Sequence, residues 1–207
     1  MTTLYEWPPT RSQRARWVLE ELGLDYESHP VNLMEGDQHA DTYRAIHPLG
    51  VVPALATDSY TLLESAAIVL QLIDENPQTN LAPAVGSAAR AIYYQWCIFA
   101  CAELDPCLMM YFDNTLRPLE AMRPPGTAHD PGIAARGRAD FASRAEMLSK
   151  VLDGRDYLVG GSFSGADIMV GHSCFMATHM ELIGDYPVLE GYYRRLAQRP
   201  GHRKAYG

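Results

Sequence analysis

The sequence predicts a small α/β unit with a mixed sheet, followed by a unit built only from helices. Strand-like segments alternate with helical periodicity up to residue 77, and Pro, Ala and Gly then crowd residues 78–86. Strand signals are absent from 87 to 207. We therefore expect a first domain at 1–77, a linker at 78–86 and an all-helical domain at 87–207.

The expected order in the first domain is β-α-β-α-β-β-α. Gly23 follows a helical stripe of apolar residues and is a natural C-cap, and Thr10 or Ser12 is a natural N-cap for the same helix. The apolar stripes are Ala15, Val18, Leu19 and Leu22 in the first helix and Ala66, Val69, Leu70 and Ile73 in the third. The predicted strands are 3–5, 26–31, 53–57 and 60–63, and the predicted helices are 10–23, 41–45 and 65–76.

In the second domain, residues 87–115 read as one long helix that Pro106 kinks. Ser164 and Asp167 have the spacing of a capping box, so they open a buried helix. The segment 117–132 contains four prolines, and its length is typical of a lid or a binding loop. Further helices are expected at 133–152 and after Pro187.

Composition and charge exclude several function classes. The formal net charge is −8 with no Lys/Arg run, so we expect neither nucleic acid nor an anionic membrane as a partner. The first residues lack the features of a secretion signal, and no apolar run is long enough to span a bilayer, which favours a cytoplasmic location. Cys97 and Cys101 have spacing that could share a metal, but without a second matching pair we expect free thiols and no metal.

One stretch has the composition of a peptide-binding site. A Pro-x-Gly turn at residues 48–50 leads through Val52 and Pro53 into a short strand, and Glu64-Ser65 then opens a helix. A cis Val52–Pro53 bond would turn the valine N–H and C=O outward, where an extended peptide could pair with them. Glu64 and Ser65 would add a carboxylate, a hydroxyl and free helix-start N–H groups. Together these groups suit a small zwitterionic peptide.

These segments, with the two-domain pattern, resemble the glutathione transferase superfamily over the whole chain. The similarity is carried by Ser12-x-Arg14-x-Arg16 with Leu19–Gly23, by His47–Leu55, by Leu63–Ile68 and by Phe163–Ile168. The resemblance implies a thioredoxin-like domain followed by a helical bundle, a homodimer, and glutathione as the co-substrate.

The resemblance also implies roles for individual residues. Val52 would offer its backbone to the cysteinyl part of glutathione, and Pro53 would be the cis proline that shapes this contact. Glu64 and Ser65 would hold the γ-glutamyl end. Gln38 lies where related enzymes place a residue near the glycyl end.

The chemistry of the family needs a donor that stabilises the glutathione thiolate. The usual position of this donor falls on Pro9, so the sequence departs from the pattern here. Ser12 and Thr10 are the two hydroxyl candidates, with Ser12 slightly favoured, and Tyr5 is a third. No cysteine lies in the loop, which disfavours thiol-exchange chemistry.

Other residues of the expected site are defined less sharply. Arg11 and Arg14 could bind a carboxylate or stabilise the thiolate. Tyr111 and Phe112 are candidates for an apolar pocket that holds the second substrate, a small hydrophobic electrophile that the sequence does not identify.

Three functions remain open at this point. The first is a glutathione transferase with a role in detoxification. The second is a glutathione-dependent isomerase of the zeta type, because Ser12-x-Arg14-x-Arg16 resembles part of that signature. The third is a non-catalytic scaffold that binds a protein partner, since Pro8-Pro9 replaces the expected catalytic position.

Overall fold

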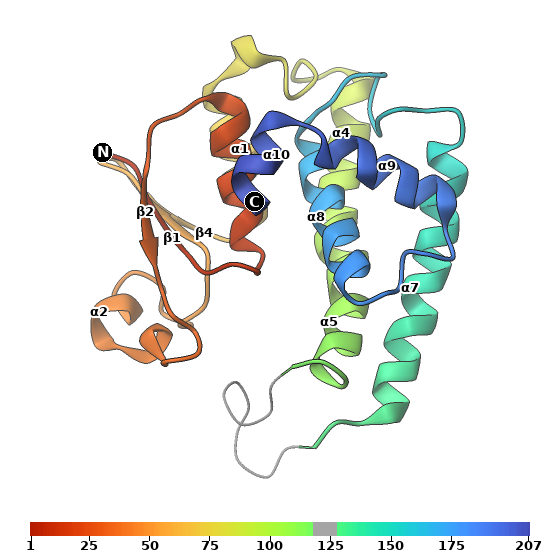
Figure 1. The fold of residues 1–207 in the computed structure, drawn as a ribbon. Helices are drawn as coiled ribbons and strands as arrows, with labels where there is room; N and C mark the ends of the chain where they lie inside the picture. The colour runs from red at the N-terminus through yellow and green to blue at the C-terminus, as the bar shows by residue number, and fades with distance from the viewer. Residues whose placement is uncertain (118–127) are drawn as a thin grey trace. The chain divides into compact units, whose positions relative to one another are not determined.

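The computed structural model describes residues 1–117 and 128–207 (Figure 1). Contacts divide the chain into two compact units. The first unit contains Met1–Asn80 together with the tail Gln198–Gly207, and the second contains Leu81–Ala197.

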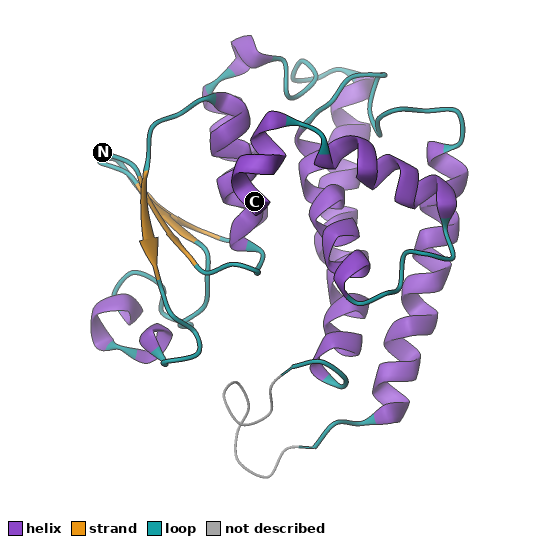
Figure 2. Ribbon diagram, viewed as in Figure 1, coloured by secondary structure: helices purple, strands orange, loops and turns teal. Residues whose placement is uncertain are grey.

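The first unit is built on a mixed sheet, as the sequence predicted (Figure 2). β1 pairs in parallel with β2 and antiparallel with β3, and β3 pairs antiparallel with β4. The cross-strand partners Leu4 and Leu55 are both fully buried, which places the core of this unit under the two central strands. The sheet order is β2-β1-β3-β4, with β1 at Thr3–Glu6, β2 at Glu27–Pro30, β3 at Ala54–Ala56 and β4 at Thr61–Leu63.

Helix α1 lies between two other helices of this unit. It packs against α3 and against α10, and Figure 1 shows α10 beside it. Gly23 has φ of 65° and ends α1 as predicted, because its left-handed backbone favours glycine. The elements that complete this unit are α1 (Ser12–Leu22), η1 (Asp37–His39), α2 (Asp41–Arg44), α3 (Ser65–Glu75), η2 (Pro77–Thr79) and α10 (Pro200–Tyr206).

The buried face of α3 differs in part from the predicted stripe. Ile68 and Leu72 are buried, whereas the predicted Ala66 and Leu70 are only half-buried. The buried pair lies two positions further along, because tertiary packing decides which side of the helix is covered, and α3 packs against α1.

The tail helix α10 is held on α1 by close and polar contacts. A Cβ added to Gly201 would lie 2.8 Å from the side chain of Glu21, so the two helices approach closely there. Arg199 donates two hydrogen bonds to the same carboxylate, at 2.8 and 2.7 Å. The ring of His202 meets Trp17 edge-on, with centroids 4.8 Å apart.

The long helix of the second unit is interrupted where the sequence predicted a kink. α4 (Ala88–Phe99) continues into a π-helical segment at Ala100–Leu104, and α5 (Asp105–Asp113) follows. Pro106 has no N–H, and its ring would clash with the carbonyl group four residues earlier. The wider π turn just before Pro106 accommodates this.

The remaining helices of the described part of the second unit are α7 (Pro131–Leu152), α8 (Gly165–His179) and α9 (Pro187–Ala197). α7 packs against α5, and a Cβ on Gly137 would lie 2.7 Å from the carbonyl oxygen of Cys107. α7 begins two residues before the predicted start because the side chain of Asp130 caps it, accepting the N–H of Gly132 at 2.8 Å. Most of the predicted lid at 117–132 lies outside the described residues.

The predicted capping box at the start of α8 is confirmed. Asp167 is fully buried and accepts the N–H of Ser164 at 2.9 Å, while Ser164 accepts in return from the third residue of the helix. The same carboxylate accepts the N–H of Leu158 at 3.0 Å and the hydroxyl of Tyr192 at 2.9 Å. Burial raises the pKa of Asp167, and the hydrogen bonds oppose this shift by stabilising its charged form.

Candidate functional site

The loop before β3 presents an unpaired backbone. The Val52–Pro53 peptide bond is cis, as expected from the sequence. The side chain of Val52 is buried, and β3 begins two residues later at Ala54. Within residues 1–117 and 128–207, neither the N–H nor the C=O of Val52 has a hydrogen-bond partner. This backbone can therefore pair with an extended ligand.

The start of α3 offers a second set of unpaired groups. Glu64 has φ of 71° and ψ of 116°, which is a strained conformation for a residue with a side chain. No side chain caps the helix, and the first intrahelical bond runs from the N–H of Ile68 to the carbonyl of Glu64. Ser65 is buried at the first helical position, while Glu64 is exposed. The result is a positive helix end beside a carboxylate.

The loop that precedes α1 places the two hydroxyl candidates together. Thr10 Oγ1 and Ser12 Oγ are 2.8 Å apart, and the N–H of Ser12 donates to Thr10 Oγ1 at 3.2 Å. Ser12 is fully buried, and its hydroxyl also lies 3.2 Å from the N–H and 3.3 Å from the carbonyl oxygen of Trp7. Thr10 is half-buried. The predicted N-cap was wrong by one residue, because Arg11 takes that position with no side-chain cap bond.

The other candidates of the first helix and strand differ in exposure. Tyr5 is half-buried and packs against the rings of His29 and Tyr43, at 5.0 and 5.9 Å between centroids. Arg11 is exposed, whereas Arg14 is fully buried. A ligand at the start of α1 can thus meet Arg11 directly, but not Arg14 without movement of the fold.

Gln38 lies in η1 and packs against the loop that carries Val52. Its side-chain amide donates to the carbonyl of Leu33 at 3.3 Å. Gly50 has φ of 60°, and a Cβ added there would lie 2.4 Å from the backbone oxygen of Gln38. The structure thus brings the backbone of Gln38 against the turn that leads to Val52.

Tyr111 and Phe112 lie on α5, in the second unit, and both are half-buried. The guanidinium group of Arg117 lies over the ring of Phe112, 5.6 Å from its centroid, and pairs with Asp113 at 2.7 Å. The two aromatic residues are adjacent on one helix, so each turns a different side to its surroundings.

Comparison with known proteins identifies the family. The profile of the "Glutathione S-transferase, N-terminal domain" matches residues 1–74. Glutathione S-transferase Z2 of Arabidopsis thaliana is 28% identical over 206 residues, covering 96% of this chain and 87% of the relative. A sphingomonad glutathione S-transferase, solved in complex with glutathione, is 29% identical with a TM-score of 0.83, covering 99% of this chain and 96% of that chain. Residues 1–74 of the chain belong to the family of the glutathione S-transferase N-terminal domain.

One relative is named for a different activity. Probable maleylacetoacetate isomerase 2 of Drosophila melanogaster is 37% identical over 79 residues, which is 37% of this chain and 35% of that protein. The similarity therefore extends to a protein named as an isomerase.

Sequence reasoning missed two residues next to the Val52 loop. The hydroxyl of Tyr43 donates to the carbonyl of Val51 at 2.6 Å. His47 is buried, and its Nδ1 has no partner in the part of the chain that the structure describes. Burial lowers the pKa of His47, and the carboxylate of Glu64 partly opposes this. Tyr43 and His47 are four residues apart at the end of the predicted 41–45 helix, and this spacing could have indicated that their side chains lie on the same side.

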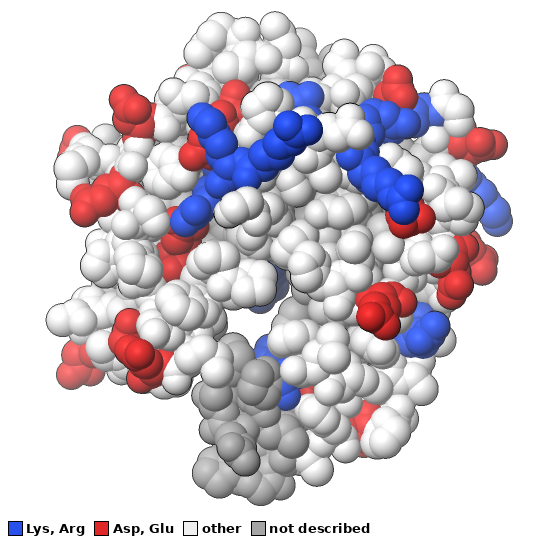
Figure 3. Space-filling view, viewed as in Figure 1, with Lys and Arg blue, Asp and Glu red and all other residues white. Residues whose placement is uncertain are grey.

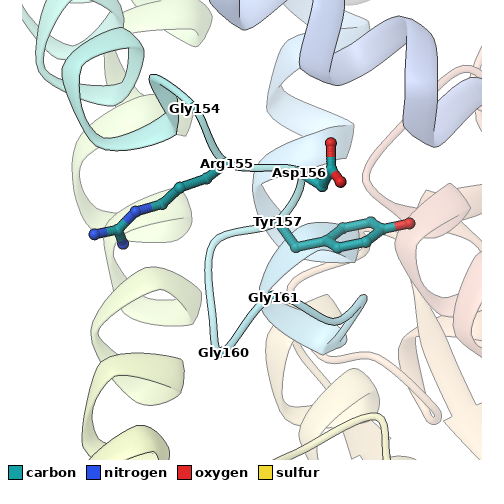
Figure 4. Close-up of a pocket in the computed structure, with 6 residues that line it drawn as sticks. All are labelled: Gly154, Arg155, Asp156, Tyr157, Gly160 and Gly161. Atoms are coloured by element: carbon teal, nitrogen blue, oxygen red, sulfur yellow. The ribbon is translucent and has the colours of Figure 1, made fainter.

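The second unit contains a cavity of about 390 Å³ that is lined by residues 154–161 of the loop joining α7 to α8 (Figure 4). Figure 4 shows the side chains of Arg155, Asp156 and Tyr157 pointing in different directions. Asp156 is already paired with Arg195 at 3.2 Å. These groups do not converge on one point, so the cavity lacks the arrangement of a binding site.

Charges on the described surface are mixed in sign. Figure 3 shows acidic and basic side chains in neighbouring positions on the face in view. Lys204 pairs with Glu20 at 3.2 Å, and Arg194 with Glu190 at 2.6 Å. Among residues 1–117 and 128–207, no cluster of three or more His, Cys, Asp or Glu side chains could hold a metal ion. None of the helices in those ranges is both long and apolar enough to cross a membrane.

Proposed function

We propose that this chain is a glutathione transferase that adds the glutathione thiolate to a small hydrophobic electrophile. The observation that carries the proposal is the combination of an unpaired Val52 backbone with the uncapped start of α3. Both lie in the first unit, and both suit an extended peptide that ends in a carboxylate and an ammonium group.

Each end of this site has a complementary part of glutathione. The cysteinyl backbone of the ligand would pair with the N–H and C=O of Val52, with Pro53 fixing the direction of the loop. The carboxylate of the γ-glutamyl residue would accept from the free N–H groups at Ser65, and its ammonium group would face the carboxylate of Glu64. The strained backbone of Glu64 supports a binding role, because such conformations concentrate at ligand sites.

Thr10 is the hydroxyl best placed to stabilise the thiolate. If Ser12 donates its hydroxyl hydrogen to Thr10, then Thr10 accepts from both the N–H and the Oγ of Ser12 and keeps its own hydrogen for a ligand. Ser12 is buried and its Oγ accepts the N–H of Trp7 at 3.2 Å, so we assign it to positioning Thr10. Arg11 and the nearby start of α1 would add positive potential.

The reaction begins with loss of the glutathione thiol proton to water. The thiolate then attacks the electrophilic carbon, an S–C bond forms, and the leaving group departs with its electron pair or an activated double bond takes up a proton from water. A hydrogen bond from Thr10 lowers the pKa of the thiol from about 8.5, so that more thiolate is present at neutral pH.

Other assignments are proposals that rest on the family resemblance. Tyr5, Arg14 and Gln38 remain predicted site residues, and Tyr111 and Phe112 a predicted pocket for the electrophile. A homodimer is supported by exposed apolar side chains on α4, where Ile92 and Ile98 are 43% and 57% exposed. A cytoplasmic location and a role in detoxification also stay predictions.

Two other functions remain candidates. The 37% identity to a protein named as a probable maleylacetoacetate isomerase favours an isomerase that uses glutathione catalytically. Pro8 and Pro9 occupy the position where a catalytic side chain was expected, which favours a scaffold without catalysis.

A glutathione titration followed by thermal unfolding tests the proposal. A ligand present at a hundred times its Kd raises the free energy of unfolding by about 2.7 kcal/mol, so Tm should rise clearly at millimolar glutathione. Glu64→Ala should remove most of this rise, while Glu35→Ala, which deletes another exposed carboxylate of the first unit, should leave it intact. A wild-type chain with no rise would support the scaffold.

Two further measurements separate the catalytic candidates. Thr10→Val should return the pKa of bound glutathione toward 8.5, as followed by the ultraviolet absorbance of the thiolate. Glutathione consumption distinguishes the enzymes: a transferase uses one glutathione for each product, whereas conversion of maleylacetoacetate without loss of glutathione would establish the isomerase.

A further inference from the structure

The turn that carries Val52 is held from one side by the segment around α2. The N–H of Gly50 donates to the carbonyl of His47 at 2.8 Å, and the hydroxyl of Tyr43 donates to the carbonyl of Val51 at 2.6 Å. The left-handed backbone of Gly50 also rests on the backbone oxygen of Gln38. These three contacts fix the residues immediately before Val52.

Tyr43 is itself fixed on several sides. The residue is 6% exposed, and its ring lies 5.9 Å from the ring of Tyr5 and 6.4 Å from the ring of His47, measured between centroids. The carbonyl of Tyr43 accepts the N–H of His47 at 2.8 Å. A side chain held this firmly places its hydroxyl oxygen at a defined position under Val51.

The contact matters because, in the part of the chain that the structure describes, no hydrogen bond of its own holds the backbone of Val52. Its N–H and C=O are unpaired within residues 1–117 and 128–207, so they belong to no ladder that could fix their direction. An adjacent peptide group that is free to rotate must lose that freedom when a ligand strand pairs with Val52. The hydrogen bond from Tyr43 to the carbonyl of Val51 restricts this rotation before the ligand binds.

We propose that Tyr43 is a positioning residue for glutathione, acting through its hydrogen bond to Val51 and without touching the ligand. The inference rests on the proposed function and deepens it. Tyr43 preorganises the backbone that receives the cysteinyl part of glutathione, so its hydroxyl contributes to glutathione affinity and not to the chemical step.

Tyr43→Phe tests this, because it removes one oxygen atom and leaves the ring in place. The hydrogen bond between Tyr43 and Val51 is only partly buried, so water can replace the lost donor and the fold should persist. Tyr26→Phe is the matched control, since it deletes a tyrosine hydroxyl that donates to Glu20 at 3.0 Å elsewhere in the same unit. Calorimetric titration gives the Kd for glutathione, steady-state kinetics separate KM from kcat, and amide hydrogen exchange reports on Gly50.

The expected result is a roughly 2- to 10-fold rise in the Kd and KM for glutathione in Tyr43→Phe, the range expected for one lost hydrogen bond. kcat at saturating glutathione and Tm should stay near wild type, the Gly50 amide should exchange faster, and Tyr26→Phe should change none of these. An unchanged Kd in Tyr43→Phe, an equal rise in both variants, or a fall in kcat with constant KM would overturn the inference alone. A wild-type chain that does not bind glutathione would overturn the proposed function as well.

Discussion

Replacing Gly50 by alanine should disturb the turn before Val52 more than its backbone angle alone predicts. Gly50 and Gly23 have nearly the same left-handed φ, 60° and 65°. A Cβ on Gly23 meets nothing within 4 Å, whereas a Cβ on Gly50 would lie 2.4 Å from the backbone oxygen of Gln38. The two alanine variants therefore carry the same conformational penalty, and only one carries a clash with backbone atoms.

The expected magnitudes follow from these geometries. A left-handed conformation costs alanine about 1–2 kcal/mol, and the reduced freedom of the unfolded chain returns about 0.4–1 kcal/mol. Gly23→Ala should therefore lower the free energy of unfolding by about 1 kcal/mol. Gly50→Ala should lose about 1–3 kcal/mol more, because the turn or the backbone of Gln38 must move to relieve the overlap.

Urea unfolding of both variants gives the difference in stability, and calorimetry gives the Kd for glutathione. Gly50→Ala should bind glutathione several-fold more weakly, since its turn leads directly into Val52. Gly23→Ala lies at the far end of α1 and should bind normally. Equal destabilisation of the two variants would refute the contact between Gly50 and Gln38 as the cause.

Two further predictions concern buried polar groups. Asp167→Ala should lower the free energy of unfolding of the second unit by about 3–5 kcal/mol, because several buried donors lose their acceptor. Tyr192→Phe removes only one of these donors and should cost about 1 kcal/mol. Urea unfolding measures both losses, and similar values for the two variants would contradict this explanation. Burial lowers the pKa of His202 to about 4. The unfolded chain, with a pKa near 6.5, therefore binds more protons below pH 6.5, and the contribution of this residue to stability should fall by about 3 kcal/mol between pH 6.5 and about 4. His202→Phe keeps an aromatic ring against Trp17, and its free energy of unfolding should fall less over that pH range than that of the wild type. If both proteins lose stability equally between pH 6.5 and about 4, His202 is not the cause of the loss.

The sequence predicted most of the elements because local signals agreed with the fold. Gly23 ends α1, the Ser164–Asp167 box opens α8, and the strands and helices of the first unit follow the expected order. These features depend on a few neighbouring residues, so periodicity and capping patterns can reveal them. The cis bond at Val52–Pro53 was likewise expected from one local motif.

Contacts between distant segments were not predictable in the same way. The helical pattern at α3 suggested that Ala66 and Leu70 were covered, but these two are half-buried and Ile68 and Leu72 are buried. Nothing in the sequence of the tail indicated that α10 packs on α1. That contact brings together Gly201 and Glu21, which lie near opposite ends of the sequence.

The candidate site shows the same division. Val52, Glu64 and Ser65 were visible as a motif, whereas the contact of Tyr43 with Val51 requires the return of the chain after α2. The sequence suggested the same role for Arg11 and Arg14, but their exposure differs: Arg11 is exposed and Arg14 is fully buried. The relation of Ser12 to Thr10 also depended on three-dimensional geometry, because both hydroxyls fit a helix start in sequence.

The position of α10 has a consequence for synthesis of the chain. The first unit contains Met1–Asn80 and the tail Gln198–Gly207, so its last structural piece leaves the ribosome after every residue of the second unit. Until then, Glu21 lacks Arg199 and the indole of Trp17 lacks the imidazole that covers it. The first unit is therefore completed only after the second unit has been synthesised, which makes residues 198–207 a structural part of the amino-terminal fold.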